Sequence, residues 1–139
     1  MTASEAKEKL LEIRTRYYQA RDAIDKMNEI RAALCCPSMP DPSKVKVQTS
    51  HYSNKQEDLL IKLVEQENIA VESVHAFLAL SKEYSSLIDS NLTGTARRVM
   101  YLHYINMLTL SKVADALEMS DGHIIRVHGQ GLRVLAQVM

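Results

Sequence analysis

The sequence contains no tryptophan, a single phenylalanine, four glycines and three prolines in 139 residues. Glycine and proline mark turns and interrupt helices, so their scarcity, with the lack of alternating β-branched runs, argues against a sheet enzyme. Leu, Ile, Val, Met and Ala supply most of the apolar residues, and 46% of the chain is hydrophobic. We therefore predict an all-α protein whose core is built mainly from aliphatic side chains.

Long apolar runs and spaced cysteine pairs are also missing. No run approaches the roughly 20 apolar residues that cross a bilayer, and residues 1–11 lack the apolar core of a signal peptide. The two cysteines, Cys35 and Cys36, are neighbours, which cannot form an unstrained disulfide with each other. A metal site of these two with His51 would lack a fourth ligand and regular spacing. We expect a cytoplasmic protein with no membrane contact, no metal and no cofactor.

The first half of the chain is expected to form two long helices. Nothing between Ser4 and Leu34 breaks a helix, and Ser4 with Lys7 makes a poor capping box at its start. Its apolar residues recur at spacings of three and four, which gives a seam of about four heptads. They are Leu10, Ile13, Tyr17, Ala20, Ile24, Met27 and Leu34. This seam can pack on the second helix of the same chain or on another copy, and both can hold at once. We predict a helical hairpin or coiled coil, and a homo-oligomer that is a dimer or higher.

Three prolines end this helix, and residues 36–54, rich in Pro, Ser, Thr and Lys, are expected to be a linker. A second helix is predicted from about Gln56 to Asn91, with two apolar stripes and hence two packing partners. One stripe comprises Leu60, Val64, Val71, Val74, Leu78 and Ile88, and the other Leu63, Ala70, Phe77, Leu80, Tyr84 and Leu87. Residues 1–92 are therefore expected to be a hairpin and oligomerisation region, followed by a second domain at 93–139.

The second domain has the apolar pattern of a helix-turn-helix, preceded by an amphipathic helix over residues 97–105. Ala114 falls where two helices cross closely and a larger side chain would separate them. Ser120 is the predicted N-cap of the second helix, and Gly131 is expected to point inward. The expected interior residues of the motif are Val113, Leu117, Met119, Ile124 and Val127, with Leu132 and Leu135 extending the second helix.

Residues Thr109–Leu135, TLSKVADALEMSDGHIIRVHGQGLRVL, resemble region 4 of sigma-70-type factors, the helix-turn-helix that reads the upstream promoter element. Residues 97–106, RRVMYLHYIN, resemble the first helix of the same unit. The order of the whole chain is a long helix, a Pro-containing linker, a second long helix and this ending. That order is similar to a family of small phage-encoded, sigma-region-4-like regulators of late-gene transcription, the ArpU/RinA type. The resemblance implies a DNA-binding transcription regulator in the cytoplasm of a bacterial host.

In such domains the second helix enters the major groove of double-stranded DNA, and side chains in its first turns touch base edges. The candidates for base contact are Ser120, Asp121, Gly122, Ile125, Arg126 and Gly129, and Arg126 is the best placed for bidentate contact to guanine. The candidates for phosphate contact are Arg97, Arg98, Lys112 and Arg133. His103 is expected on the helix surface, and His128 in the groove or on the surface.

Residues 93–139 carry only two more bases than acids, which are Arg97, Arg98, Lys112, Arg126 and Arg133 against Asp115, Glu118 and Asp121. One copy should therefore bind DNA weakly at physiological salt, and an oligomer would add affinity. We predict a sequence-specific transcription regulator, and the resemblance implies that it activates late genes. The alternatives are a sigma-like subunit that acts only with RNA polymerase, and a helical protein-interaction or packaging adaptor. Enzymatic activity is not expected, because there is no Gly-rich phosphate loop and the acids have the spacing of surface and turn positions.

Overall fold

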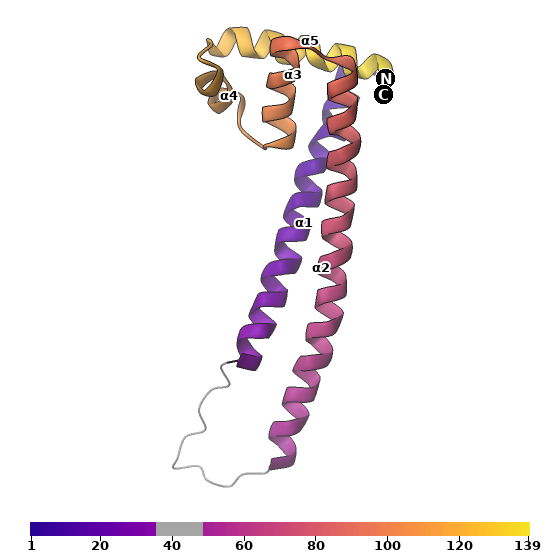
Figure 1. The fold of residues 1–139 in the computed structure, drawn as a ribbon, viewed down its shortest axis with the longest axis vertical. Coiled ribbons are helices and arrows are strands. Elements are labelled where there is room, and N and C mark those ends of the chain that lie inside the picture. The colour runs from indigo at the N-terminus through magenta and orange to yellow at the C-terminus, as the bar shows by residue number, and fades with distance from the viewer. Residues whose placement is uncertain (36–48) are drawn as a thin grey trace. The chain divides into compact units, whose positions relative to one another are not determined.

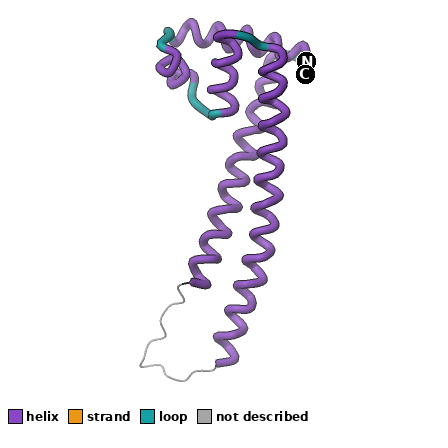
Figure 2. The backbone as a smooth tube through the Cα atoms, viewed as in Figure 1, coloured by secondary structure: helices purple, strands orange, loops and turns teal. Residues whose placement is uncertain are grey.

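The computed structural model describes residues 1–35 and 49–139, with side chains described from Lys55 onward in the second range. Within these ranges every regular element is helical and there is no strand, as predicted (Figure 2). None of these helices is long and apolar enough to cross a membrane. The elements are α1 (Ala3–Cys35), α2 (Thr49–Asn91), α3 (Gly94–Met100), the π-helical turn η2 (Tyr101–Ile105), α4 (Leu110–Leu117) and α5 (Asp121–Val138).

The described residues form two compact units, one of residues 1–17 and 76–139 and the other of residues 18–75. Both long helices contribute to each unit. These limits differ from a division at residues 92 and 93, because the first turns of α1 and the last turns of α2 pack into the core of the C-terminal helices. That core contains Leu10 and Ile13 from α1, Tyr84, Ile88 and Leu92 from α2 and its end, and Met100, Tyr104, Leu132 and Leu135 from the C-terminal helices.

The start of α1 is held by a reciprocal capping box between Thr2 and Glu5. The Glu5 backbone N–H donates to Thr2 Oγ1 at 3.2 Å, and the Thr2 N–H donates to Glu5 Oε2 at 2.8 Å. The hydrogen bond from the Thr2 backbone N–H is the main cause that lowers the pKa of the Glu5 carboxyl. Ser4 and Lys7, which the sequence offers only as a poor capping box, do not form the cap, because a lysine offers no acceptor for the backbone N–H at the helix start.

The second helix begins at Thr49, seven residues before the predicted start at Gln56. The predicted linker over residues 36–54 is therefore wrong in its last six residues, which are helical. Cys36 and the rest of residues 36–48 lie outside the described residues, as does the side chain of His51. Among the side chains that the structure does describe, no group of His, Cys, Asp and Glu could hold a metal ion.

In each unit α1 and α2 pack side by side and run antiparallel (Figure 1). In the first unit the Tyr17 ring meets the Phe77 ring edge-on, with centroids 5.6 Å apart. In the second unit Gln66 Nε2 donates to the Ala23 carbonyl at 3.0 Å. The seam of α1 therefore packs on the α2 stripe that contains Leu63, Ala70, Phe77, Leu80, Tyr84 and Leu87, all of which are buried or half-buried. The hairpin interpretation of that seam is confirmed within each unit.

Candidate nucleic-acid interface

α4, its turn and α5 form a helix-turn-helix with a small core of its own. This core joins Val99 of α3 to Val113 and Ala114 of α4 and to Ile124 and Val127 of α5. Ala114 is almost fully buried, at the position where the two helices were predicted to cross closely. Val113, Ala114, Ile124 and Val127 have the inward orientation that the apolar spacing predicts.

The turn between α4 and α5 differs from the prediction at Met119. Glu118 ends α4 in the left-handed conformation, with φ of 55°, and the Met119 N–H donates to the Ala114 carbonyl at 3.0 Å. The chain leaves the helix at this point, so the Met119 side chain is exposed and does not fill the turn. Leu117, which is half-buried, packs against the core instead.

Both helices of the motif begin with a hydroxyl cap. Thr109 Oγ1 accepts from the Lys112 N–H, and Ser120 Oγ accepts from the His123 N–H, both at 3.3 Å. The predicted N-cap at Ser120 is confirmed. Since Asp121 lies in the first turn of α5, its carboxylate meets the positive end of the helix, which favours it.

The outer ridge of α5 is the surface formed by Gly122, Ile125, Arg126, Gly129 and Arg133. These positions share one side of the helix at 3.6 residues per turn, opposite the buried Ile124 and Val127. Ile125 is 57% exposed, and Arg126 Nε donates to the Gly122 carbonyl at 3.3 Å. All are exposed except Gly129, which is half-buried, and the remaining base-contact candidates, Ser120 and Asp121, are exposed at the helix start.

The glycines of α5 divide by environment. A Cβ added at Gly122 or Gly129 would meet no atom within 4 Å, whereas one at Gly131 would lie 2.9 Å from Met100 Cγ. The expectation that Gly131 points inward for close helix packing is confirmed. Gly122 and Gly129 serve no such purpose, although each is unfavourable in a helix.

Of the predicted phosphate contacts, Arg98, Lys112 and Arg133 are exposed. Arg97 is different, because its Nε donates to Asp89 Oδ1 at 2.8 Å in an ion pair with both side chains about half exposed. Such a pair contributes little to stability, but it offsets the positive charge of Arg97. The local excess of positive charge is thus carried mainly by the other bases.

A buried polar cluster lies behind the candidate interface, and sequence reasoning missed it. His103 and His128 are only 8% and 7% exposed, so their predicted surface positions are wrong. The Tyr104 hydroxyl and His128 Nε2 share a hydrogen bond of 2.7 Å. Burial is the main cause that lowers the pKa of both histidines, that of His128 to about 4, and it raises the pKa of Tyr104.

The π-helical turn explains why helical spacing wrongly predicts His103 on the surface. A π turn holds one residue more than an α turn, which rotates the following side chains relative to a 3.6-residue period. His103 and Tyr104 therefore face inward, while Leu102 and Ile105 are half-buried. His103 Nδ1 donates to the Leu108 carbonyl at 2.7 Å, and the Arg14 guanidinium donates to the His103 carbonyl at 3.3 Å. The missing signal is a contact between residues distant in sequence, which no local pattern contains.

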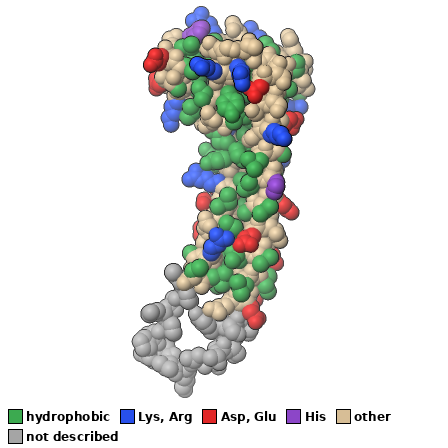
Figure 3. All heavy atoms as spheres, viewed as in Figure 1, with side chains coloured by type: hydrophobic (Ala, Val, Ile, Leu, Met, Phe, Trp, Pro, Cys, Tyr) green, Lys and Arg blue, Asp and Glu red, His purple; other side chains and the backbone are tan. Residues whose placement is uncertain are grey.

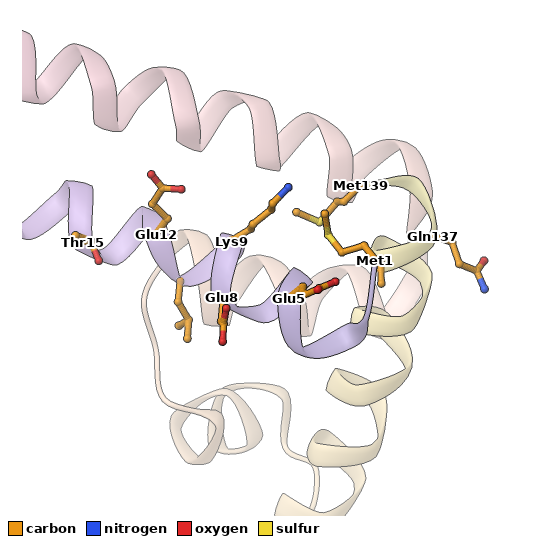
Figure 4. A pocket seen from close by; sticks show the side chains of 10 residues that line it. Met1, Glu5, Glu8, Lys9, Glu12, Thr15, Gln137 and Met139 are labelled. Carbon is orange, nitrogen blue, oxygen red and sulfur yellow. The ribbon is translucent and has the colours of Figure 1, made fainter.

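A hollow of about 980 Å³ lies between the first turns of α1 and the end of α5 (Figure 4). Its lining includes the acids Glu5, Glu8 and Glu12 against the single base Lys9. This balance repels a phosphate backbone, so the hollow is a poor nucleic-acid surface. The outer ridge of α5 is the better candidate.

Comparison with known proteins gives one family. The model of a family described as "Protein of unknown function (DUF1492)" matches residues 34–136, which run from the end of α1 into the last turn of α5. No curated protein and no solved structure matches the chain.

Proposed function

Since the chain belongs to the DUF1492 family, whose description assigns no function, we propose from its geometry that it is a sequence-specific DNA-binding transcription regulator. It acts as a homo-oligomer in the cytoplasm of a bacterial host and activates phage late genes; the phage, host and activator roles follow from the resemblance to ArpU/RinA-type, sigma-region-4-like regulators. One observation carries the proposal. The outer ridge of α5 is solvent-facing along a helix whose other side packs on α3 and α4, as a recognition helix requires.

Two features of the ridge support direct reading of bases. Arg126 presents a guanidinium, which matches the O6 and N7 acceptors of guanine, and the exposed Ile125 can meet a thymine methyl group. Gly122 and Gly129 leave the backbone open to close approach, because nothing in the chain lies where their Cβ atoms would be. Lys112 is exposed near the start of α4, where a lysine can contact a phosphate.

The test is selection from a random duplex DNA library with the full chain, followed by fluorescence anisotropy on the enriched duplex and a scrambled one. We expect Arg126→Ala to weaken binding to the enriched duplex by about tenfold and to reduce the preference over the scrambled duplex. Lys112→Ala should weaken binding to both duplexes equally. Gln137→Ala, exposed in the last turn of α5, is the matched control. No enrichment, or an unchanged preference in Arg126→Ala, would contradict direct readout.

The modest positive charge favours one second candidate, a sigma-like subunit that acts only with RNA polymerase. With Arg97 paired to Asp89, few bases remain to hold phosphates, and a polymerase would supply the missing affinity. In that case the same anisotropy assay detects binding to promoter DNA only after core polymerase is added.

A further inference from the structure

We propose that a groove between α3 and α4 is the docking site for an acidic amphipathic helix of a protein partner. This α3–α4 groove has a volume of about 640 Å³ and lies within the compact unit of residues 1–17 and 76–139. Its lining includes Arg97, Arg98, Tyr101, Leu102, Ala116 and Leu117. The inference goes beyond the proposed function, because it concerns a protein partner and its test selects that partner without DNA.

The α3–α4 groove has the shape that a docked helix needs. Its α3 wall runs from Gly94 to Tyr101, which is a length of about 10.5 Å, or two helical turns. Gly94, Arg98 and Tyr101 follow one another at spacings of four and three residues, so they share one side of the helix. A Cβ added at Gly94 would meet no atom within 4 Å, so this end of the groove is open. Such a wall matches two turns of a helix whose anchors recur at i, i+3 or i+4, and i+7.

Apolar side chains form the rest of the lining and are not fully covered. Tyr101 is 37% exposed, Ala116 is exposed, and Leu102 and Leu117 are half-buried. Leu102 and Leu117 also pack against the core of the helix-turn-helix, which holds both walls of the groove in place. Aliphatic side chains of a partner would lose contact with water on docking here, which favours binding. A phosphate backbone would gain nothing from these apolar groups.

The charge beside the α3–α4 groove sets the sign of the partner. No acid occurs from Ser90 to Ala114, a stretch that contains Arg97, Arg98 and Lys112. Arg97 pairs with Asp89 at 2.8 Å, whereas Arg98 is exposed and forms no ion pair with the residues that the structure describes. Figure 3 shows Lys and Arg side chains beside hydrophobic side chains over α3, on the face in view. An acidic partner therefore finds an available counter-charge next to apolar surface.

The acids of α4 and its cap do not cancel this charge. No residue in the lining is acidic, although Asp115 and Glu118 flank Ala116 and Leu117 in the sequence. Asp115 is about 100° around the helix from Ala116 and about 160° from Leu117, and the chain leaves the helix at Glu118. Lys112 is only about 40° around the helix from Ala116. Both walls thus place a base, rather than an acid, near the apolar lining.

The experiment selects peptides of about 16 residues, long enough for about four helical turns, from a random display library on the immobilised full chain. We expect the enriched peptides to be acidic, with aliphatic residues at i, i+3 or i+4, and i+7. One enriched peptide is then synthesised with a fluorophore, and anisotropy gives its dissociation constant. A scrambled peptide of the same composition, which lacks the apolar period, should bind about tenfold more weakly or less.

Two substitutions test where the enriched peptide binds. Arg98→Glu reverses a charge beside the groove, and Ala116→Glu places a carboxylate on its apolar wall. Each should raise the dissociation constant of the peptide about tenfold or more, because like charges then face each other. Both positions are exposed, so circular dichroism should give the helicity of the wild type.

Ser111→Glu is the matched control. Ser111 is also an exposed residue of α4, and the substitution adds the same charge, but about 140° around the helix from Ala116. It should leave the affinity for the peptide unchanged. An enriched peptide that binds Arg98→Glu and Ala116→Glu as tightly as the wild type overturns the inference. So does enrichment of basic peptides alone, which suit the acid-lined hollow at the start of α1.

The other occupants of the α3–α4 groove have outcomes of their own. Sedimentation of the chain without peptide tests a second copy: a wild-type oligomer that dissociates in Ala116→Glu but not in Ser111→Glu assigns the groove to that copy and overturns the choice of partner. Absence of any enriched peptide also overturns the inference. If Arg98→Glu then weakens DNA binding, the base beside the groove is a phosphate contact.

The two proposals can fail separately. A chain without sequence preference in the DNA assay can still bind the acidic peptide. A chain that enriches no peptide can still distinguish the enriched duplex from the scrambled one. Arg126→Ala separates them as well, because Arg126 is not among the residues that line the groove and its substitution should leave the affinity for the peptide unchanged.

Discussion

The hydroxyl of Tyr104 lies 2.7 Å from Nε2 of His128, with both side chains buried. This hydrogen bond joins η2 to α5 in the core of the C-terminal helices. Tyr104→Phe keeps the ring but leaves a buried ring nitrogen without this partner, so we expect the free energy of unfolding to fall by about 1–3 kcal/mol. Urea denaturation followed by circular dichroism measures the change. Tyr101→Phe, at an exposed neighbour, should change it by less than about 0.5 kcal/mol. Equal stability of the two variants would contradict the prediction.

Acid should destabilise the protein through His128. Burial, followed by the charges of His103 and Lys7, lowers its pKa from 6.5 to about 4, so between these values the unfolded chain binds a proton that the folded chain does not. Stability therefore falls as the pH drops from about 6.5 to 4 and levels off below, with a total loss of about 3 kcal/mol from this residue. Urea titrations at several pH values measure the slope.

His128→Asn provides the comparison for the acid effect. Asparagine does not titrate, so the variant should lose most of the slope between pH 6.5 and about 4, although it is less stable at neutral pH. The lowered pKa of His103 acts in the same direction and should leave a smaller residual slope. A His123→Asn variant, altered at an exposed position, should keep the full wild-type slope. If His128→Asn and the wild type have the same slope, the acid effect comes from other groups.

Local sequence patterns predict the buried face of each short helix, but they do not predict the contacts between residues far apart in the sequence. The buried positions of Val113, Ala114, Ile124 and Val127 follow from helical spacing, because one side of a short amphipathic helix must face the core. The bond from Tyr104 to His128 joins residues 24 apart, and the π turn that orients it leaves no sign in the apolar period. In the candidate interface, helical spacing predicts which side chains of α5 are exposed. It does not predict the ion pair of Arg97, because the partner lies in α2, which is not part of the motif.

The left-handed residue of the turn predicts a stabilising substitution. Glu118 has φ of 55°, a conformation that costs a residue with a side chain roughly 1 kcal/mol more than glycine. Glu118→Gly should therefore raise the free energy of unfolding by about 0.5–1 kcal/mol, and Glu118→Ala should not. Because Glu118 is exposed, no packing is lost in either variant. Thermal and urea denaturation measure both, and a Glu118→Gly variant less stable than Glu118→Ala would contradict the prediction.

Alanine substitutions at two glycines of α5 should have opposite effects on stability. Gly131→Ala places a Cβ 2.9 Å from Met100 Cγ in a buried position, and we expect it to cost about 1–3 kcal/mol of stability. Gly129→Ala meets nothing within 4 Å, so it should stabilise the helix by about 0.5–1 kcal/mol.

If the α5 backbone approaches DNA at Gly129, the methyl group added by Gly129→Ala occupies space that the duplex needs. The variant should then be more stable than the wild type and yet bind the enriched duplex several-fold more weakly, a combination that unfolding cannot produce. Denaturation and anisotropy on the same preparation measure both quantities. A Gly129→Ala variant with raised stability and unchanged affinity would mean that the backbone at this position does not approach the duplex, and base contact would then rest on Arg126 and Ile125.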